Sequence, residues 1–433
     1  MKASYIKNQL LKSVSSIQDN PAPFVKHAGR DFTRKRKCPL SSVIYCILTT
    51  EAHSLNREIR RYFSCKNQSI PTKSAFCQQR AKLNDTLFPF LLSELNRIPF
   101  QKTLNGYHLL ACDGSDVNIP PQKDCSSTFV RSNTEDVGYY QVHLNALYDV
   151  LEKRYTDIYV QPRAEINERA ALKILVERNF IKDKCLYIAD RGYFSLDILA
   201  MFLQSQQKFL LRLPKPDAVS SFLHRFALPD ADSFDVPLPF YFSRTRSQKK
   251  TGGIPVVFLL PHQAESLIPP QDHSSKVKVS LRLVKLKLSS GEYEYLLTNL
   301  PKKEASTNTV TNIYHLRWGI ETSFRYLKYN AALTSFHSVR RDFIIQEIYA
   351  RIILYNFTQL ILATVSIPEK RTKYNYMISV SDAIAICRDF LIQRWTHDKL
   401  EKSLLRYLIP VKPGRAFPRK VRSKRYIPFT NRT

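Results

Sequence analysis

The sequence predicts an α/β protein in which a mixed sheet carries helices on its faces and is flanked by helical regions. Residues 107–213 alternate apolar strand-like runs with two helical patterns, in the order three strands, helix, strand, helix, strand. Residues 214–292 show the rough two-residue alternation of β-strands. Apolar residues at helical spacing recur before residue 105 and after residue 313.

The composition indicates a nucleic-acid partner. The chain of 433 residues has 66 Lys and Arg against 37 Asp and Glu, a net charge of +29. Such an excess attracts a polyanion and releases its counterions, whereas an enzyme of small metabolites has no need of it. The 44% of hydrophobic residues is enough for packed cores. We therefore expect double-stranded DNA as the partner and no small-molecule substrate.

Cysteine usage and apolar runs indicate a cytoplasmic protein. The eight cysteines form no Cys-x2-Cys pair, which argues against a zinc or redox motif. The N-terminus lacks the apolar core of a signal peptide. The most apolar long run, residues 343–365, contains Gln346, Glu347 and Arg351, so we expect a buried helix and no membrane span.

Residues 1–104 are expected to be helical. A basic cluster precedes an apolar helix over residues 40–48, and Thr72 is placed to cap a helix that carries Lys73, Gln79 and Arg80. Short helices with a Gln- and Arg-rich member resemble a helix-turn-helix reader of DNA. An ordinary helical domain with a solvated basic face explains the pattern equally well.

Two acids follow apolar strands in residues 105–213. Asp113 ends the first strand, before a Gly-Ser turn, and Asp190 ends the fourth, before Arg191 and Gly192. An Asp-Gly pair alone is usually only a turn, and other carboxylates such as Asp116 are available. The shared context nevertheless favours these two, because neighbouring strand ends are where open α/β sheets place their sites.

A third acid lies in the helical pattern of residues 313–330. Tyr314, Arg317, Glu321 and Lys328 fall within about 60° of arc on one helix face. A solvated face with an Arg317–Glu321 pair is the simpler alternative. Three clustered carboxylates repel one another unless a cation binds, and oxygen ligands favour Mg²⁺ or Mn²⁺.

These motifs together resemble the DDE transposases of bacterial insertion sequences, in insertion-sequence family four, which carries the signature Tyr-x2-Arg-x3-Glu-x6-Lys. The matching segments are "DFTRKRKCPLSSVI", "CDGSDVNIP", "IADRGYF" and "YHLRWGIETSFRYLK". The resemblance implies a ribonuclease-H-like core with Asp113, Asp190 and Glu321 as metal ligands. It implies that Tyr314, Arg317 and Lys328 handle DNA phosphates, and Arg191 is a further candidate contact.

The resemblance also implies a mechanism and a setting. Two metal ions, bridged by Asp113, would drive cleavage and joining of transposon ends. The partners would be terminal inverted repeats and target DNA, held by a homodimer at the nucleoid of a bacterium. Rival interpretations are a non-catalytic DNA-binding regulator derived from a transposase and a metal-dependent nuclease without joining activity.

Family members use an aromatic residue of an insertion domain to hold a flipped base. Here Trp318 and Trp395, the two tryptophans, lie outside the insertion, so Phe240, Tyr241 and Phe242 are the candidates. The expected divisions are a helical DNA-binding region (1–104), the catalytic core (105–213 and 293–365), an all-β insertion (214–292), and a C-terminal helical region with a basic tail (366–433).

Overall fold

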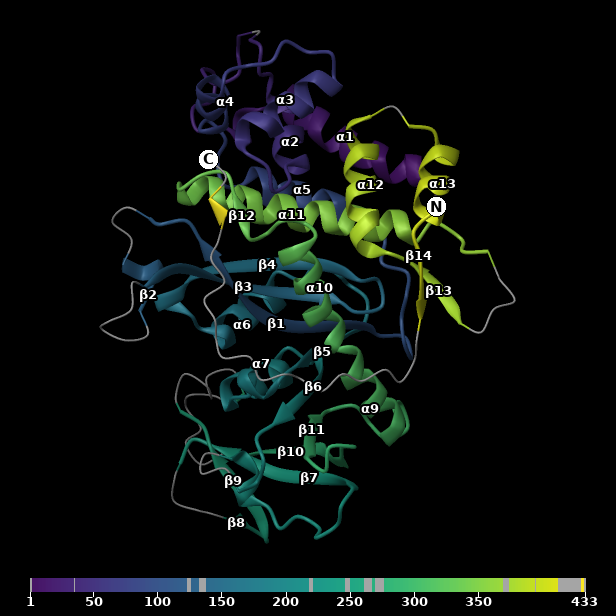
Figure 1. Ribbon diagram of the computed structural model, residues 1–433. Coiled ribbons are helices and arrows are strands. Elements are labelled where there is room, and N and C mark those ends of the chain that lie inside the picture. The colour runs from purple at the N-terminus through teal and green to yellow at the C-terminus, as the bar shows by residue number, and fades with distance from the viewer. Residues whose placement is uncertain are drawn as a thin grey trace.

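One mixed sheet of eleven strands, within the part of the chain that the structure describes, forms the centre of the protein (Figure 1). The structure is a computed structural model and describes residues 2–34, 36–122, 126–131, 138–217, 221–245, 250–260, 267–268, 276–368, 374–393, 395–411 and 430–431. Helices cover both faces of the first half of this sheet.

Five strands make the half of the sheet that carries the acids, in the spatial order β4-β3-β1-β5-β6. β5 is parallel to β1 and to β6, whereas β3 is antiparallel to β1 and to β4. This arrangement is ribonuclease-H-like, so the predicted fold class is confirmed. The strands are β1 (His108–Ile119), β3 (Tyr139–Asp149), β4 (Arg154–Pro162), β5 (Cys185–Ala189) and β6 (Lys208–Leu213), and the short β2 (Phe129–Val130) extends the edge beside β3.

The second half of the sheet continues from the first without a break. β11 pairs with β6 on one side and with β10 on the other, and β7, β9 and β8 follow in that order. The β-strands expected in residues 214–292 are present, but they share one sheet with the core. The domain boundaries themselves stay a prediction. The strands are β7 (Phe234–Ser243), β8 (Lys250–Thr251), β9 (Ile254–Phe258), β10 (Lys276–Lys287) and β11 (Tyr293–Thr298).

Alternate residues of β1 point to two different cores. Leu109 and Ala111 pack in one core with α10 and the N-terminal helices, while Leu110 and Cys112 pack in the other with α6 and α7. This alternation places Asp113 on the α10 side and Gly114 on the α6 side. The helices are α6 (Glu168–Glu177), α7 (Leu196–Gln204), α9 (Thr307–Leu316) and α10 (Trp318–Tyr329).

Helix α11 (Arg341–Leu362) lies between the sheet and the N-terminal helices, as the prediction of a buried helix requires (Figure 1). Its polar side chains are bonded on both sides: Asn356 bonds the backbone of Tyr155 on β4, and Arg351 donates to the carbonyl of Thr50. No helix in the described residues is long and apolar enough to cross a membrane. The N-terminal helices are α1 (Ala3–Asp19), α2 (Leu40–Thr49), α3 (Leu55–Cys65), α4 (Lys73–Arg80) and α5 (Leu87–Asn96).

Smaller elements complete the described chain. The C-terminal helices are α12 (Val380–Ile392) and α13 (His397–Leu405); the short strand pairs are β12 (Ser335–Phe336) with β15 (Thr430–Asn431) and β13 (Asn375–Ile378) with β14 (Leu408–Val411). The 3₁₀ helices are η1 (Ala22–Phe24), η2 (Ser126–Thr128), η3 (Arg163–Glu165), η4 (Arg191–Tyr193) and η5 (Phe222–Arg225). The predicted basic tail lies outside the described residues, apart from the strand β15.

Helix α4 begins at the predicted residue, but two of its side chains that were expected at a DNA surface point into the protein. The Thr72 side chain accepts a hydrogen bond from the amide of Ala75 and caps the helix. Arg80, expected at a DNA surface, is buried instead and pairs with Glu347 of α11 at 2.9 Å. Gln79 is buried beside it. Arg80 holds α4 to α11. Because both side chains are buried, the expectation that they contact DNA is wrong for the folded protein, while Lys73 stays half-buried at the surface.

We expect Arg80→Ala to lower the free energy of unfolding by about 3–5 kcal/mol, because it leaves the carboxylate of Glu347 buried without its strongest partner. Lys73→Ala, on the same helix, should change the stability by less than about 0.5 kcal/mol. Urea unfolding of the three proteins measures both. A stable Arg80→Ala variant with weakened DNA binding would return Arg80 to the DNA surface.

Candidate active site

Asp113 on β1 and Asp190, the residue that directly follows β5, occupy neighbouring positions at the edge of two parallel strands. Cys112 pairs with Ala189 in the register of β1 and β5, so each acid is the next residue on its strand. Parallel neighbours lie about 4.8 Å apart, and side chains at matching positions point to the same face. The predicted juxtaposition of two strand-end acids is therefore present in the structure.

The chain around Asp113 differs from the expected turn. Gly114 and Ser115 continue β1 as strand residues opposite Asn145 and Leu144 of β3. Pairing with the neighbouring strand β3 outweighs the local turn preference of an Asp-Gly-Ser sequence. Asp113 thus lies inside a strand, at the point where the parallel pairing with β5 stops. The Gly114 amide donates to its carboxylate at 2.9 Å.

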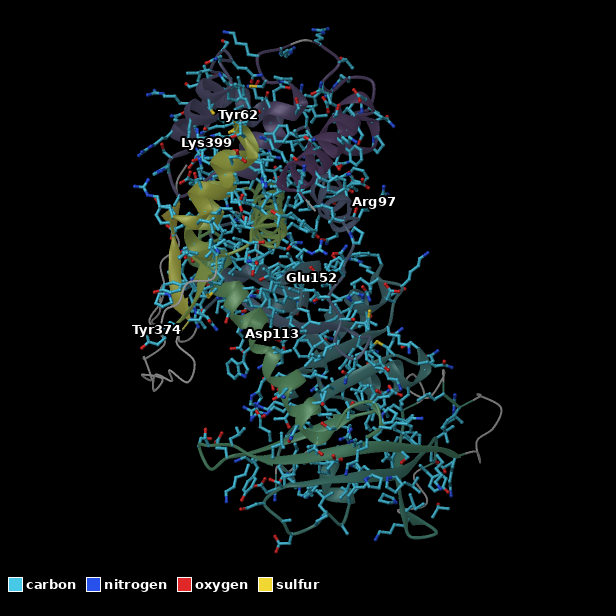
Figure 2. All side chains as sticks on the ribbon, turned by 90° about the vertical axis from the view of Figure 1, so that its right-hand side faces the viewer. Tyr62, Arg97, Asp113, Glu152, Tyr374 and Lys399 are labelled. Atoms are coloured by element: carbon cyan, nitrogen blue, oxygen red, sulfur yellow. The ribbon has the colours of Figure 1, made fainter. Side chains whose placement is uncertain are left out.

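Arg317 connects the third acid to the first. Its guanidinium lies 2.9 Å from Oε1 of Glu321 and 3.4 Å from Oδ2 of Asp113, and only 3% of its side chain is exposed. Figure 2 shows Asp113 beside the ribbon of α10. The Arg317–Glu321 pair is therefore no solvated surface pair, because it bridges a helix to the sheet through a buried cation.

The predicted single helix over residues 313–330 is divided at Arg317. The Arg317 amide bonds the carbonyl of Tyr314, and the Ile320 amide bonds the carbonyl of Arg317, so one tight turn of 3₁₀ type separates α9 from α10. Tyr314 then lies on α9, and Glu321 lies on α10. Trp318, the first residue of α10, is 45% exposed next to Arg317.

The electrostatics of this group are those of crowded carboxylates. Burial raises the pKa of Asp113 to about 6; Glu321 and Asp190 add to the rise, and Arg317 and the Gly114 amide oppose it. Burial opposes the charge of Arg317, but Tyr314 and the three carboxylates outweigh it and raise the pKa of Arg317. The acids therefore interact with one another and with one shared cation.

The donor set suits a hard divalent cation, although the described residues contain no group of three or more His, Cys, Asp or Glu side chains close enough to hold a metal. Asp113, Asp190 and Glu321 offer only carboxylate oxygens, the ligands of Mg²⁺ and Mn²⁺. The Arg317 guanidinium already stands between two of them as a cation. The carboxylate oxygens of the three acids therefore suit a divalent cation as ligands.

A family model described as "Transposase DDE domain" matches residues 105–357, which contain all three acids and most of the sheet. The chain belongs to the DDE transposase family. A cryo-EM structure of the piggyBac transposase synaptic complex with hairpin DNA is similar in fold, with 11% sequence identity and a TM-score of 0.45. That similarity covers 95% of this chain and 84% of the other. No match was found among curated proteins.

The other residues predicted to contact phosphate lie around the acids in different settings. Tyr314 is 1% exposed, and burial raises its pKa to about 12. Lys328 is half-buried at the end of α10, close enough to Asp116 for the two charges to interact. Arg191 is exposed directly after Asp190. Lys328 and Arg191 can therefore meet a phosphate at the rim, whereas Tyr314 lies beneath it.

A second charged group, not identified from the sequence, lies on the opposite face of the sheet. Nδ1 of His143 on β3 is 2.7 Å from Asp116, and Nε2 is 3.3 Å from Glu168 at the start of α6. Burial lowers the pKa of His143, but its contacts with the two carboxylates raise it to about 9, so the ring is charged at neutral pH. The alternation of β3 could have placed His143 on the α6 face. No sequence pattern near His143 indicates that its side chain contacts Glu168.

The three aromatic candidates for base stacking lie on β7 and face different environments. Phe240 and Phe242 are fully buried in the core with Phe222, so neither ring can stack on a base while that core is intact. Tyr241, between them, points to the other face and is half-buried. The expectation is therefore wrong for the two phenylalanines and stays a prediction for Tyr241.

Phe240→Ala should lower the free energy of unfolding by about 3–5 kcal/mol, because it leaves a cavity in the second core. Tyr241→Ala should fold normally. If Tyr241 holds a flipped base, the substitution should also slow hairpin formation roughly tenfold or more, since base stacking contributes about 1–3 kcal/mol. Thermal melts and hairpin assays separate the two effects, and normal hairpin formation by Tyr241→Ala would remove it from the site.

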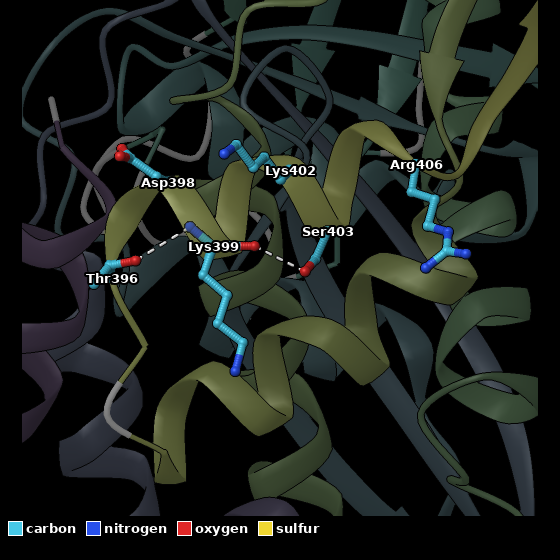
Figure 3. A pocket seen from close by; sticks show the side chains of 6 residues that line it. All are labelled: Thr396, Asp398, Lys399, Lys402, Ser403 and Arg406. Carbon is cyan, nitrogen blue, oxygen red and sulfur yellow. Dashed lines mark hydrogen bonds between the residues drawn. The ribbon is translucent and has the colours of Figure 1, made fainter.

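An open hollow of about 420 Å³ lies on α13, away from the acids. Figure 3 shows the side chains that line it, and Figure 2 places Lys399 of this helix well above Asp113. The lining residues are Thr396, Asp398, Lys399, Lys402, Ser403 and Arg406. A single carboxylate among three cations does not supply a metal site, so this hollow is not the catalytic centre.

Proposed function

We propose that the chain is a DNA transposase that cuts the ends of an insertion sequence and joins them to target DNA by metal-dependent phosphoryl transfer. Within the DDE transposases we place it in insertion-sequence family four, on its Tyr314-Arg317-Glu321-Lys328 signature. One observation carries the proposal: the adjacent positions of Asp113 and Asp190, with Glu321 tied to Asp113 through Arg317. The three carboxylates come from distant parts of the chain, two from neighbouring strand positions and one from α10.

Each side chain has a role that follows from its position. Asp113, Asp190 and Glu321 would hold two divalent cations, Mg²⁺ or Mn²⁺. Such cations, when bound, activate the attacking oxygen and stabilise the leaving one. Arg317 offsets the charge of the carboxylates from its buried position between Asp113 and Glu321. Lys328 supplies positive charge at the end of the same helix.

The partners proposed are the terminal inverted repeats, as duplex DNA, and a target duplex. The net charge of +29 supports a long phosphate surface. We propose a homodimer in which one protomer acts on the end bound by the other, in the bacterial cytoplasm. Short inverted repeats in the DNA that flanks the gene would support this assignment over a DNA-binding regulator.

A non-catalytic regulator and a nuclease without joining activity are the alternatives. A regulator does not need three carboxylates held against the repulsion that burial increases, so the raised pKa of Asp113 favours an enzyme. A nuclease would cleave the ends and never join them. Incubation of pre-cleaved ends with a supercoiled plasmid distinguishes the two enzymes, because a transposase yields joined products.

Asp113→Asn, Asp190→Asn and Glu321→Gln should each abolish cleavage of a transposon-end duplex. Binding to that duplex should persist, because each change removes a negative charge that repels phosphate. Nicking of labelled end DNA measures the first effect, and a gel-shift titration measures the second. Near-normal nicking by any of the three variants would exclude that residue from the metal site.

Lys328→Ala should bind end DNA with a shallower salt dependence. Each phosphate contact that is lost lowers the slope of log affinity against log salt by about 0.9 for duplex DNA. Lys153→Ala is the matched control, since it removes the same charge from the exposed β3–β4 turn at the opposite end of β1. Affinity across a salt series, with thermal melts, gives the result. Equal slopes for wild type and Lys328→Ala would leave Lys328 as ordinary surface charge.

A further inference from the structure

The side chains of His143 and Glu168 lie against Gly114, the residue that follows Asp113. A Cβ added at Gly114 would stand 2.2 Å from Nε2 of His143 and 3.0 Å from Oε1 of Glu168. Approaches under 3.0 Å essentially never occur for real Cβ atoms. A side chain at position 114 would therefore force the imidazole to shift away from the backbone of β1, one residue beyond the first acid.

The same glutamate reaches the segment that follows Asp190. A Cβ at Gly192 would lie 3.5 Å from Oε2 of Glu168, which is ordinary van der Waals contact. The next residue, Arg169, donates from Nε to the carbonyl of Gly192 at 3.2 Å. One helix end thus touches the chain after both strand acids.

The position of Glu168 is fixed by its own helix. It is the first residue of α6, and the Asn167 side chain caps that helix by accepting from the amide of Ala170 at 3.0 Å. His143 is fixed from the other side by the 2.7 Å contact of its Nδ1 with Asp116. Both side chains lie on the α6 face of the sheet, whereas Asp113 faces α10.

We propose that His143 and Glu168 form a clamp that positions Asp113 and Asp190 for divalent cations from the opposite face of the sheet. The inference rests on the proposed function of the three acids. The clamp touches no DNA and no reacting atom, so His143 and Glu168 are positioning residues. Residues that orient metal ligands in this way typically change metal affinity or activity 10–100-fold when they are replaced.

The test compares Glu168→Gln with wild type and with Glu177→Gln, an exposed position at the end of the same helix. Glutamine keeps the volume of Glu168 and removes the charge that faces His143. The readouts are the Mn²⁺ concentration at half-maximal thermal stabilisation of the DNA-free protein and the Mn²⁺ dependence of end nicking. We expect both midpoints to rise about tenfold or more for Glu168→Gln and to stay unchanged for Glu177→Gln.

A second pair of variants separates positioning from packing. Gly114→Ala should lower the melting temperature and raise the Mn²⁺ midpoint, because its Cβ displaces the imidazole from its contacts with Asp116 and Glu168. Adding His143→Ala makes room and should restore much of the melting temperature, while the Mn²⁺ midpoint stays raised.

The outcomes distinguish this inference from the proposed function. If Glu168→Gln has a lower melting temperature but unchanged Mn²⁺ midpoints, the clamp contributes only to packing, and this inference alone is overturned. Wild-type Mn²⁺ midpoints in the Gly114→Ala, His143→Ala double variant would overturn it in the same way. A wild-type protein that is neither stabilised by Mn²⁺ nor able to nick end DNA would overturn the proposed function, and the clamp with it.

Discussion

The repulsion between carboxylates at one edge of the parallel strands is the constraint on which the site depends. Asp113 and Asp190 occupy matching positions on β1 and β5, and Glu321 adds a third charge from α10. Burial increases the energy of such a group because little water screens it. Arg317 lies among these acids, at 2.9 Å from Glu321 and 3.4 Å from Asp113. This one cation therefore links α10 to β1 at the acids, beside the apolar core that α10 and β1 share.

The two faces of the sheet carry different charged groups near that edge. The α10 face carries the acids and Arg317, whereas the α6 face carries His143 between Asp116 and Glu168. Strand alternation alone produces the division, because successive residues of β1 point to opposite sides. Gly114 is the position at which the two groups come closest through the strand, and the lack of a side chain there allows it. A change on one face can therefore move a ligand on the other through the backbone of β1.

The sequence predicted most strands and helices, and the neighbouring positions of Asp113 and Asp190, because those signals are local. An apolar run that ends in Asp, or a four-residue helical signature, can be recognised without knowledge of tertiary contacts. Arg80 and Phe240 were misplaced because their partners, Glu347 and the ring of Phe222, lie 267 and 18 residues away. A basic helix and an aromatic strand look alike in sequence whether they face solvent or core. His143 escaped notice for the same reason, since its pairing depends on the register of β1 with β3 and on the start of α6.

The inserted strands take part in placing the third acid, because they are continuous with the core sheet. Arg282 of β10 makes a bidentate pair with Asp235 of β7 at 2.8 and 2.6 Å and donates to the carbonyl of Ala305 at 2.6 Å. Asp235 also accepts a hydrogen bond from Thr307, the first residue of α9. The start of the helix pair that carries Arg317 and Glu321 is thus bonded to two strands of residues 214–292. The buried Arg282 therefore ties β7 and β10 to the segment from which α9 and α10 begin, so the position of the third carboxylate depends on residues 214–292 as well as on the core strands.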